Sequence, residues 1–146
     1  MASHQSKLIW RGGMTFDTIV DGKQNLPFIF SSGFEDPAEG EKGYTPMGVL
    51  LASLAGCTAM DVVSILKKKR QNLTHFEVEV EGEQQNEHPH VYREITVTYR
   101  VNSEVESDAL QRAIDLSVNK YCSVNAMLKE VATITYRHEQ LVPDSQ

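Results

Sequence analysis

Hydrophobic and polar positions alternate with a period of two in three parts of the chain, and this pattern predicts β-strands there. The turn signals Gly12-Gly13 and Asp21-Gly22 separate the N-terminal segments from one another. The expected strands cover residues 6–10, 14–20, 26–30, 74–84, 91–101 and 132–141. We expect the two central strands to form an antiparallel hairpin, because only a short polar connection separates them.

Helical periodicity predicts three helices between these strands. The longest covers residues 45–70, with Thr45 at the N-cap and Pro46 at the first helical position. Its side chains are apolar or small on most faces, so we expect it to be buried on most sides. An amphipathic helix over residues 106–121 and a short helix over residues 122–131 follow, with a bend between them.

The resulting order of elements, βββ-α-ββ-αα-β, segregates strand runs from helix runs. This order predicts an α+β fold in which antiparallel sheets pack with a long central helix. Residues 31–44 are rich in glycine and acidic side chains, and we expect them to form a loop. The length of 146 residues suits one domain, so residues 1–146 are expected to form a single domain.

The charge of the chain excludes several classes of partner. A net charge of −6 disfavours binding to nucleic acid or to an anionic membrane surface. The basic run at residues 67–70 is interpreted as a cationic helix end that complements the helix dipole. The uncharged run at residues 45–60 is shorter than the about 20 apolar residues that span a bilayer. We therefore expect no nucleic acid and no membrane among the partners.

Cysteine and histidine usage indicates the compartment and the absence of a metal centre. The N-terminus lacks the apolar segment of a signal peptide, and Cys57 and Cys122 lack the CxxC spacing. Such usage is typical of the reducing cytoplasm, so we expect a cytoplasmic protein. His88 and His90 flank a proline in a polar connection, which we interpret as a solvated loop. No metal and no other cofactor is expected.

The two cysteines are the candidates for chemistry. Free cysteines are often buried as small hydrophobes, so a purely structural role is one interpretation. Two features favour a reactive pair instead. Cys57 follows Gly56 among small side chains, which leaves room for a substrate or a second thiol. Cys122 lies where one expected helix ends and the next begins, and the positive end of a helix stabilises a thiolate.

The segments that contain these cysteines, GYTPMGVLLASLAGCTAMDVVSILKKKR and NKYCSVNAML, resemble the OsmC/Ohr family of osmotically inducible and organic hydroperoxide resistance proteins. The resemblance extends from the Trp10-Arg11-Gly12-Gly13 turn to the last strand, and its signatures are similar to those of an uncharacterised OsmC-like branch. It implies an OsmC-like fold and an intertwined homodimer in which the long helix packs against its symmetry mate. Each of two sites would contain both cysteines of one chain and residues from the other.

The resemblance also implies thiol-dependent reduction of hydroperoxides as part of an oxidative stress response. Cys57 would attack the distal peroxide oxygen as a thiolate and become a sulfenic acid, with which Cys122 would condense to a disulfide. A dithiol reductant of the lipoyl type would regenerate the pair by exchange. The expected partners are a second copy of the chain, a small hydroperoxide or apolar small molecule, and this dithiol.

Two charged residues of the family pattern are replaced here. Peroxidatic members carry Glu after the helix-opening proline and Arg after the paired glycines, where this sequence has Met47 and Met14. Arg11 is the candidate replacement for the arginine that stabilises the Cys57 thiolate. The neighbouring loop supplies three candidates for the acidic partner: Glu35, Glu39 and Glu41. Without a cation, a thiol in an apolar pocket reacts slowly with peroxide.

Three functions therefore stay open. The first is reduction of hydroperoxides by the cysteine pair. The second is binding of a small apolar ligand without turnover, which the flexible side chains of Met14 and Met47 would favour. The third is a redox sensor that uses the same cysteines without turnover. Turnover of an organic hydroperoxide with a dithiol separates the first function from the other two.

Overall fold

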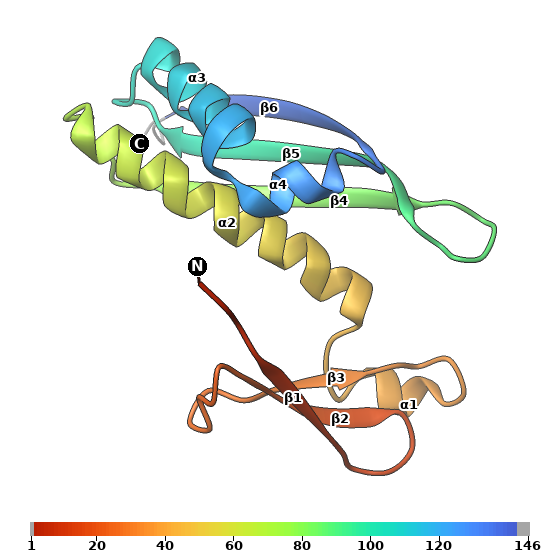
Figure 1. Cartoon of the computed structure of the whole chain (residues 1–146). Coiled ribbons are helices and arrows are strands. Elements are labelled where there is room, and N and C mark those ends of the chain that lie inside the picture. The colour runs from red at the N-terminus through yellow and green to blue at the C-terminus, as the bar shows by residue number, and fades with distance from the viewer. Residues whose placement is uncertain (1, 143–146) are drawn as a thin grey trace. The chain divides into compact units, whose positions relative to one another are not determined.

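The structure is a computed structural model that describes residues 2–142. The chain divides into two compact units, residues 1–50 and residues 51–146, and each unit contains one three-stranded sheet (Figure 1). The long helix α2 (Pro46–Lys68) begins in the first unit and continues into the second. The expected α+β fold with a long helix between two groups of strands is confirmed.

The first unit is an antiparallel sheet in the order β1-β2-β3, as expected. Gly12 and Gly13 turn the chain between β1 and β2 with φ values of 93° and 54°, which glycine adopts without steric cost. The expected loop contains a short helix, for which the Asp36 side chain caps the Ala38 N–H. The elements of this unit are β1 (Ser6–Trp10), β2 (Thr15–Val20), β3 (Phe28–Ser31) and α1 (Pro37–Gly40).

The second unit contains the sheet β4-β5-β6. The expected hairpin of β4 (Phe76–Gln84) and β5 (Tyr92–Asn102) is antiparallel, but β6 (Thr133–Leu141) runs parallel to β5. The expectation of purely antiparallel sheets is therefore wrong at this strand. The helical segment between β5 and β6 returns the chain to the start of β5, and a parallel pair requires such a long crossover.

This crossover consists of three helical pieces. They are α3 (Ser107–Leu116), the π-helix η1 (Ser117–Tyr121) and α4 (Ser123–Leu128). At the position of the expected bend between two helices, the structure has the π-helical turn η1, which is wider than an α-helical turn. Single π-helical turns are rare in proteins and occur often at functional sites. Cys122 is the residue between η1 and α4.

Helix α2 starts as expected, because the Gly48 N–H donates to Thr45 Oγ1 at 3.2 Å and Pro46 occupies the first helical position. One stripe of its side chains is buried in the second unit: Leu54, Thr58, Val62 and Leu66. The expectation that α2 is buried on most sides is wrong within one chain, since its other faces are half-buried or exposed. By length and apolar composition α2 would also suit a membrane span, but its buried stripe packs it into the protein core.

Candidate functional site

The core of the second unit surrounds a set of polar side chains. Val97, Tyr99 and Val101 alternate on the buried face of β5, and none of them is exposed. Helices α2 and α3 supply the opposing apolar side chains: Leu54, Val62, Leu66, Leu110 and Ile114. The hydroxyl of Tyr99 therefore lies in an apolar environment, where it requires a hydrogen-bond partner.

A chain of hydroxyl groups supplies that partner. Tyr99 Oη lies 2.7 Å from Thr58 Oγ1 on α2, which lies 2.8 Å from Ser117 Oγ on η1. The Ser117 hydroxyl also lies 2.9 Å from Asp61 Oδ2, to which it donates. Burial raises the pKa of Tyr99 to about 12, so its phenol stays protonated at neutral pH. The chain of hydrogen bonds thus connects β5, α2 and η1 and ends at a carboxylate.

Cys122 is held beside this chain by backbone hydrogen bonds. Its N–H donates to the Ser117 carbonyl oxygen at 2.7 Å, which is the bond that closes the π-helical turn. Its sulfur accepts from the Asn125 N–H at 3.4 Å, so Cys122 is the N-cap of α4. The side chain is only 3% exposed. The position of this thiol is therefore set by residues on both sides of it in the sequence.

Asn125 on α4 and Tyr136 on β6 form further hydrogen bonds around Cys122. The Asn125 side chain donates to the Val118 carbonyl oxygen at 3.0 Å and accepts a hydrogen bond from the Tyr136 hydroxyl. Asn125 is 1% exposed, so these bonds satisfy a buried amide. They link η1, α4 and β6 around Cys122.

The two expected cysteines come together in this region. Both are free thiols, and Cys57 on α2 lies near enough to Cys122 to raise the pKa of the Cys122 thiol. The pKa of the Cys122 thiol is raised to about 12, mainly by burial. The Asn125 N–H lowers it, whereas Cys57 and the Asp61 carboxylate contribute to the rise. The expected position of Cys122 at a helix start is confirmed, and the Asn125 N–H of that helix lowers the pKa of the thiol, but burial outweighs this effect.

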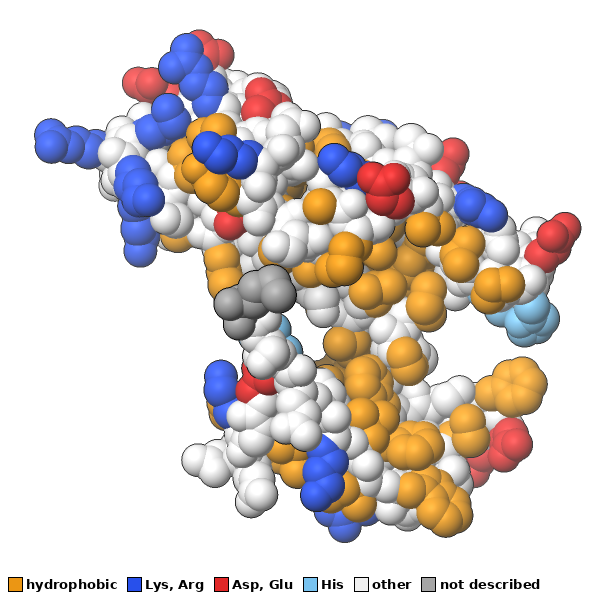
Figure 2. Space-filling view, in the orientation of Figure 1, with side chains coloured by type: hydrophobic (Ala, Val, Ile, Leu, Met, Phe, Trp, Pro, Cys, Tyr) orange, Lys and Arg blue, Asp and Glu red, His pale blue; other side chains and the backbone are white. Residues whose placement is uncertain are grey.

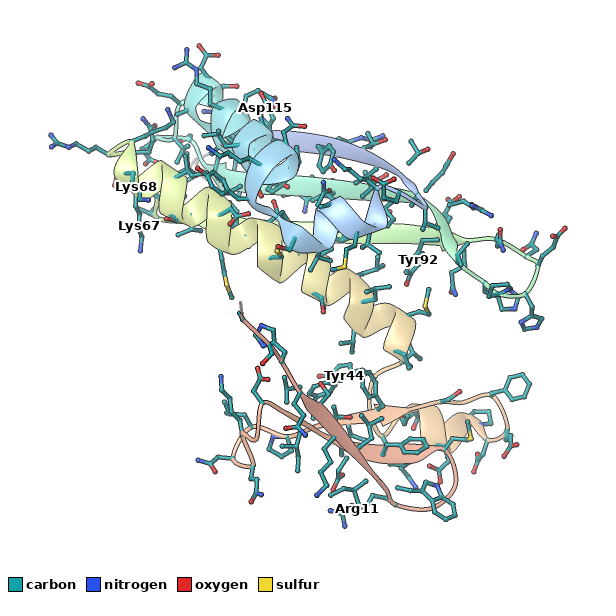
Figure 3. All side chains as sticks on the ribbon, in the orientation of Figure 1. Arg11, Tyr44, Lys67, Lys68, Tyr92 and Asp115 are labelled. Atoms are coloured by element: carbon teal, nitrogen blue, oxygen red, sulfur yellow. The ribbon has the colours of Figure 1, made fainter. Side chains whose placement is uncertain are left out.

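Arg11 belongs to the first unit, directly after β1, and is labelled in Figure 3. Its guanidinium pairs with Asp17 on β2. Glu39 accepts from Thr15 Oγ1 and pairs with Lys42 at 3.1 Å. A role of Arg11 at Cys57 stays a prediction.

Sequence reasoning found the cysteines but missed the polar residues around them. These are Thr58, Asp61, Tyr99, Ser117, Asn125 and Tyr136. One of them carried a signal: Asp61 is the only acid in α2 and follows Cys57 by one helical turn. The others are ordinary strand and helix residues in the sequence, and only the packing brings them together.

Comparison with known proteins identifies the family. Residues 39–137 match the model of the OsmC-like protein family. The chain is 36% identical to protein YhfA of Escherichia coli K12 over 92% of this chain and 96% of that protein. This chain therefore belongs to the OsmC-like protein family.

Solved structures agree with this assignment. The crystal structure of a hypothetical protein from Aquifex aeolicus VF5 is 33% identical, with a TM-score of 0.84 over 97% of this chain and 98% of that one. The organic hydroperoxide resistance protein OhrB of Bacillus subtilis shares the fold at 14% identity, with a TM-score of 0.69 over 94% of this chain and 98% of that one. The likeness to OhrB concerns the fold alone.

Proposed function

We propose that this protein reduces organic hydroperoxides with the thiol pair Cys57 and Cys122. The observation that carries the proposal is that two free thiols from different helical elements of one core lie near each other. Neighbouring thiols form a disulfide when their Cβ atoms can approach to about 4 Å. The substrate class of the proposal is the one for which OhrB, a protein of the same fold, is named.

The proposed reaction balances with these two residues and a dithiol. The Cys57 thiolate attacks the distal peroxide oxygen, the O–O bond breaks, and the alkoxide takes a proton to leave as an alcohol. The Cys122 thiol then displaces hydroxide from the Cys57 sulfenic acid, and its proton converts the hydroxide to water. A lipoyl-type dithiol reduces the resulting disulfide and becomes a disulfide itself. The reducing cytoplasm is the proposed compartment.

The second candidate function is binding of a small apolar molecule without turnover. A groove of about 620 Å³ between α2 and η1 favours it, because much of its lining is apolar. The groove is lined by Met60, Asp61, Ser64, Ile65, Lys68, Lys69, Leu116 and Tyr121. Pockets of this size and lining are typical of small-molecule sites.

Turnover separates the two functions. We expect steady-state reduction of cumene hydroperoxide by the protein with reduced lipoamide, measured as alcohol formed and dithiol consumed. The same assay with hydrogen peroxide tests whether an organic group is required. Protein that binds cumene hydroperoxide but forms no alcohol would contradict the proposed reaction and favour the binding function.

We further propose that the protein is a homodimer and that α2 lies in its interface. Apolar side chains gather on the surface of the second unit (Figure 2). Among those of α2, Met60 is 76% exposed. Ala59, Met60 and Val63 line one open surface of this helix. A contiguous exposed apolar surface of this kind is typical of a protein–protein interface.

Sedimentation equilibrium is expected to give twice the chain mass of 16.4 kDa at micromolar concentration. Met60→Glu should shift the equilibrium toward monomer, because a charge would be buried in the interface. The control Met127→Glu changes a methionine of α4 that is 66% exposed, and it should leave the mass unchanged if α2 is the interface. A wild-type protein that sediments as a monomer at this concentration would contradict the proposal.

A further inference from the structure

Asp61 occupies an unusual position beside the thiol pair. It follows Cys57 by one turn on α2, and residues one turn apart lie on the same side of a helix. It is half-buried, in a helix whose other charged residues are the lysines at its C-terminal end. A half-buried carboxylate beside a reactive group acts on it strongly, since the surrounding dielectric constant is low.

Ser117 connects this carboxylate to Cys122. The Ser117 hydroxyl donates to Asp61 at 2.9 Å, and the Ser117 carbonyl oxygen accepts from the Cys122 N–H at 2.7 Å. Ser117 is completely buried, whereas Asp61 is half-buried at the edge of the groove beside α2. One residue thus holds the carboxylate and the backbone of the second thiol in a fixed relation.

The groups that face the Cys122 thiol come from four elements. Cys57 and Asp61 approach from α2, the Asn125 N–H from α4, and the phenols of Tyr99 and Tyr136 lie on β5 and β6. Burial raises the pKa of both phenols, so they are neutral at neutral pH.

The lysine of η1 contacts a neighbouring ring: the Lys120 ammonium lies over the Tyr121 ring, 5.2 Å from its centre. Asp61 is the carboxylate among the groups that face the Cys122 thiol, and its charge acts on the pKa of this thiol in the same direction as burial, which is the largest cause.

We propose that Asp61 assigns different roles to the two thiols: its negative charge, held in place by Ser117, disfavours a thiolate at Cys122 and leaves Cys57 as the thiol that ionises and reacts first. A thiolate disfavours ionisation of a neighbouring thiol, so a nearby charge biases which of the two ionises first. Asp61 does not touch the peroxide in this scheme and is a positioning residue. The assignment to nucleophile and resolving thiol rests on the proposed function, whereas the effect on thiol ionisation does not.

The test is a titration of Cys122 alone. In a Cys57→Ser background, the Cβ chemical shift of isotopically labelled cysteine reports ionisation of Cys122 without requiring access for a reagent. Adding Asp61→Asn removes the charge but keeps an oxygen that accepts from Ser117. We expect the midpoint of Cys122 to fall by about one pH unit or more, as is typical for loss of a like charge nearby.

Two further variants separate charge from structure. Asp61→Glu restores the carboxylate and should return the midpoint toward that of the parent, which a purely structural role would not require. Asp115→Asn removes the same charge from an exposed site on α3, labelled in Figure 3, and should not move the midpoint. If Asp61→Asn does not fold, Asp61→Ser removes the charge and carries the same test.

The outcomes distinguish the inference from the proposed function. An unchanged Cys122 midpoint in Asp61→Asn, or an equal shift in Asp115→Asn, overturns the inference even if the wild-type protein reduces hydroperoxides. A wild-type protein without hydroperoxide turnover overturns the proposed function, but the titration still decides whether Asp61 controls the ionisation of Cys122.

Discussion

Cys57→Ser is expected to lower the steady-state reduction of cumene hydroperoxide by about 10³-fold or more, because a serine hydroxyl does not replace a thiolate as nucleophile toward peroxide. The change is nearly isosteric, and Cys57 is half-buried, so the fold should persist. The measurement is alcohol formed per protein with excess reduced lipoamide. A variant that retains a tenth or more of the wild-type rate would show that Cys57 is not the nucleophile.

Cys122→Ser is the matched control, because it should fail at a different step. Its Cys57 should still reduce about one equivalent of hydroperoxide, and the sulfenic acid should then persist or oxidise further to the sulfinic acid. Mass analysis of non-reduced peptides should find a Cys57–Cys122 bridge in oxidised wild-type protein and none in this variant. Recovery of over-oxidised Cys57 with a free Cys122 thiol from wild-type protein would contradict the resolving role.

Leu66→Ala is expected to lower the free energy of unfolding by about 3 kcal/mol, the usual cost of emptying a leucine-sized space in a core. Leu66 is the last residue of the buried stripe of α2, and none of its surface is exposed. Urea unfolding followed by circular dichroism, at one protein concentration for all variants, measures this difference.

Leu116→Ala provides the comparison for this prediction. Leu116 ends α3 and is 39% exposed, so the same deletion of atoms leaves little cavity there and should cost less than about 1 kcal/mol. Equal losses of stability in the two variants would contradict the assignment of the α2 stripe to the core.

Local signals made most of the elements predictable. Gly12 and Gly13 turn the chain where the sequence indicates a turn, and Thr45 and Pro46 start α2 as expected. Alternation in β5 identified its buried face, on which Tyr99 lies. These features depend on backbone preferences and side-chain periodicity within a few residues, which any reader of the sequence can evaluate.

Other features of the fold depend on contacts between distant segments. The direction of β6 was not predictable, because alternation is the same in parallel and antiparallel strands and only the length of the crossover brings Thr133 beside Glu94. The exposed side of α2 was missed for a related reason. Apolar side chains around a helix indicate burial, but they do not tell whether the same chain or another molecule covers them.

The features of the candidate site also fall into two groups: those that the local sequence predicts and those that depend on contacts between distant segments. The sequence by itself determined which residues carry a thiol and that Cys122 lies at the start of a short helix, since both follow from residue type and local pattern. Only the tertiary structure showed that Cys57 lies near Cys122, and that Ser117 links Cys122 to Asp61. Ionisation of a thiol depends on burial and on charges that folding brings near it, and neither quantity is present in a local stretch of sequence.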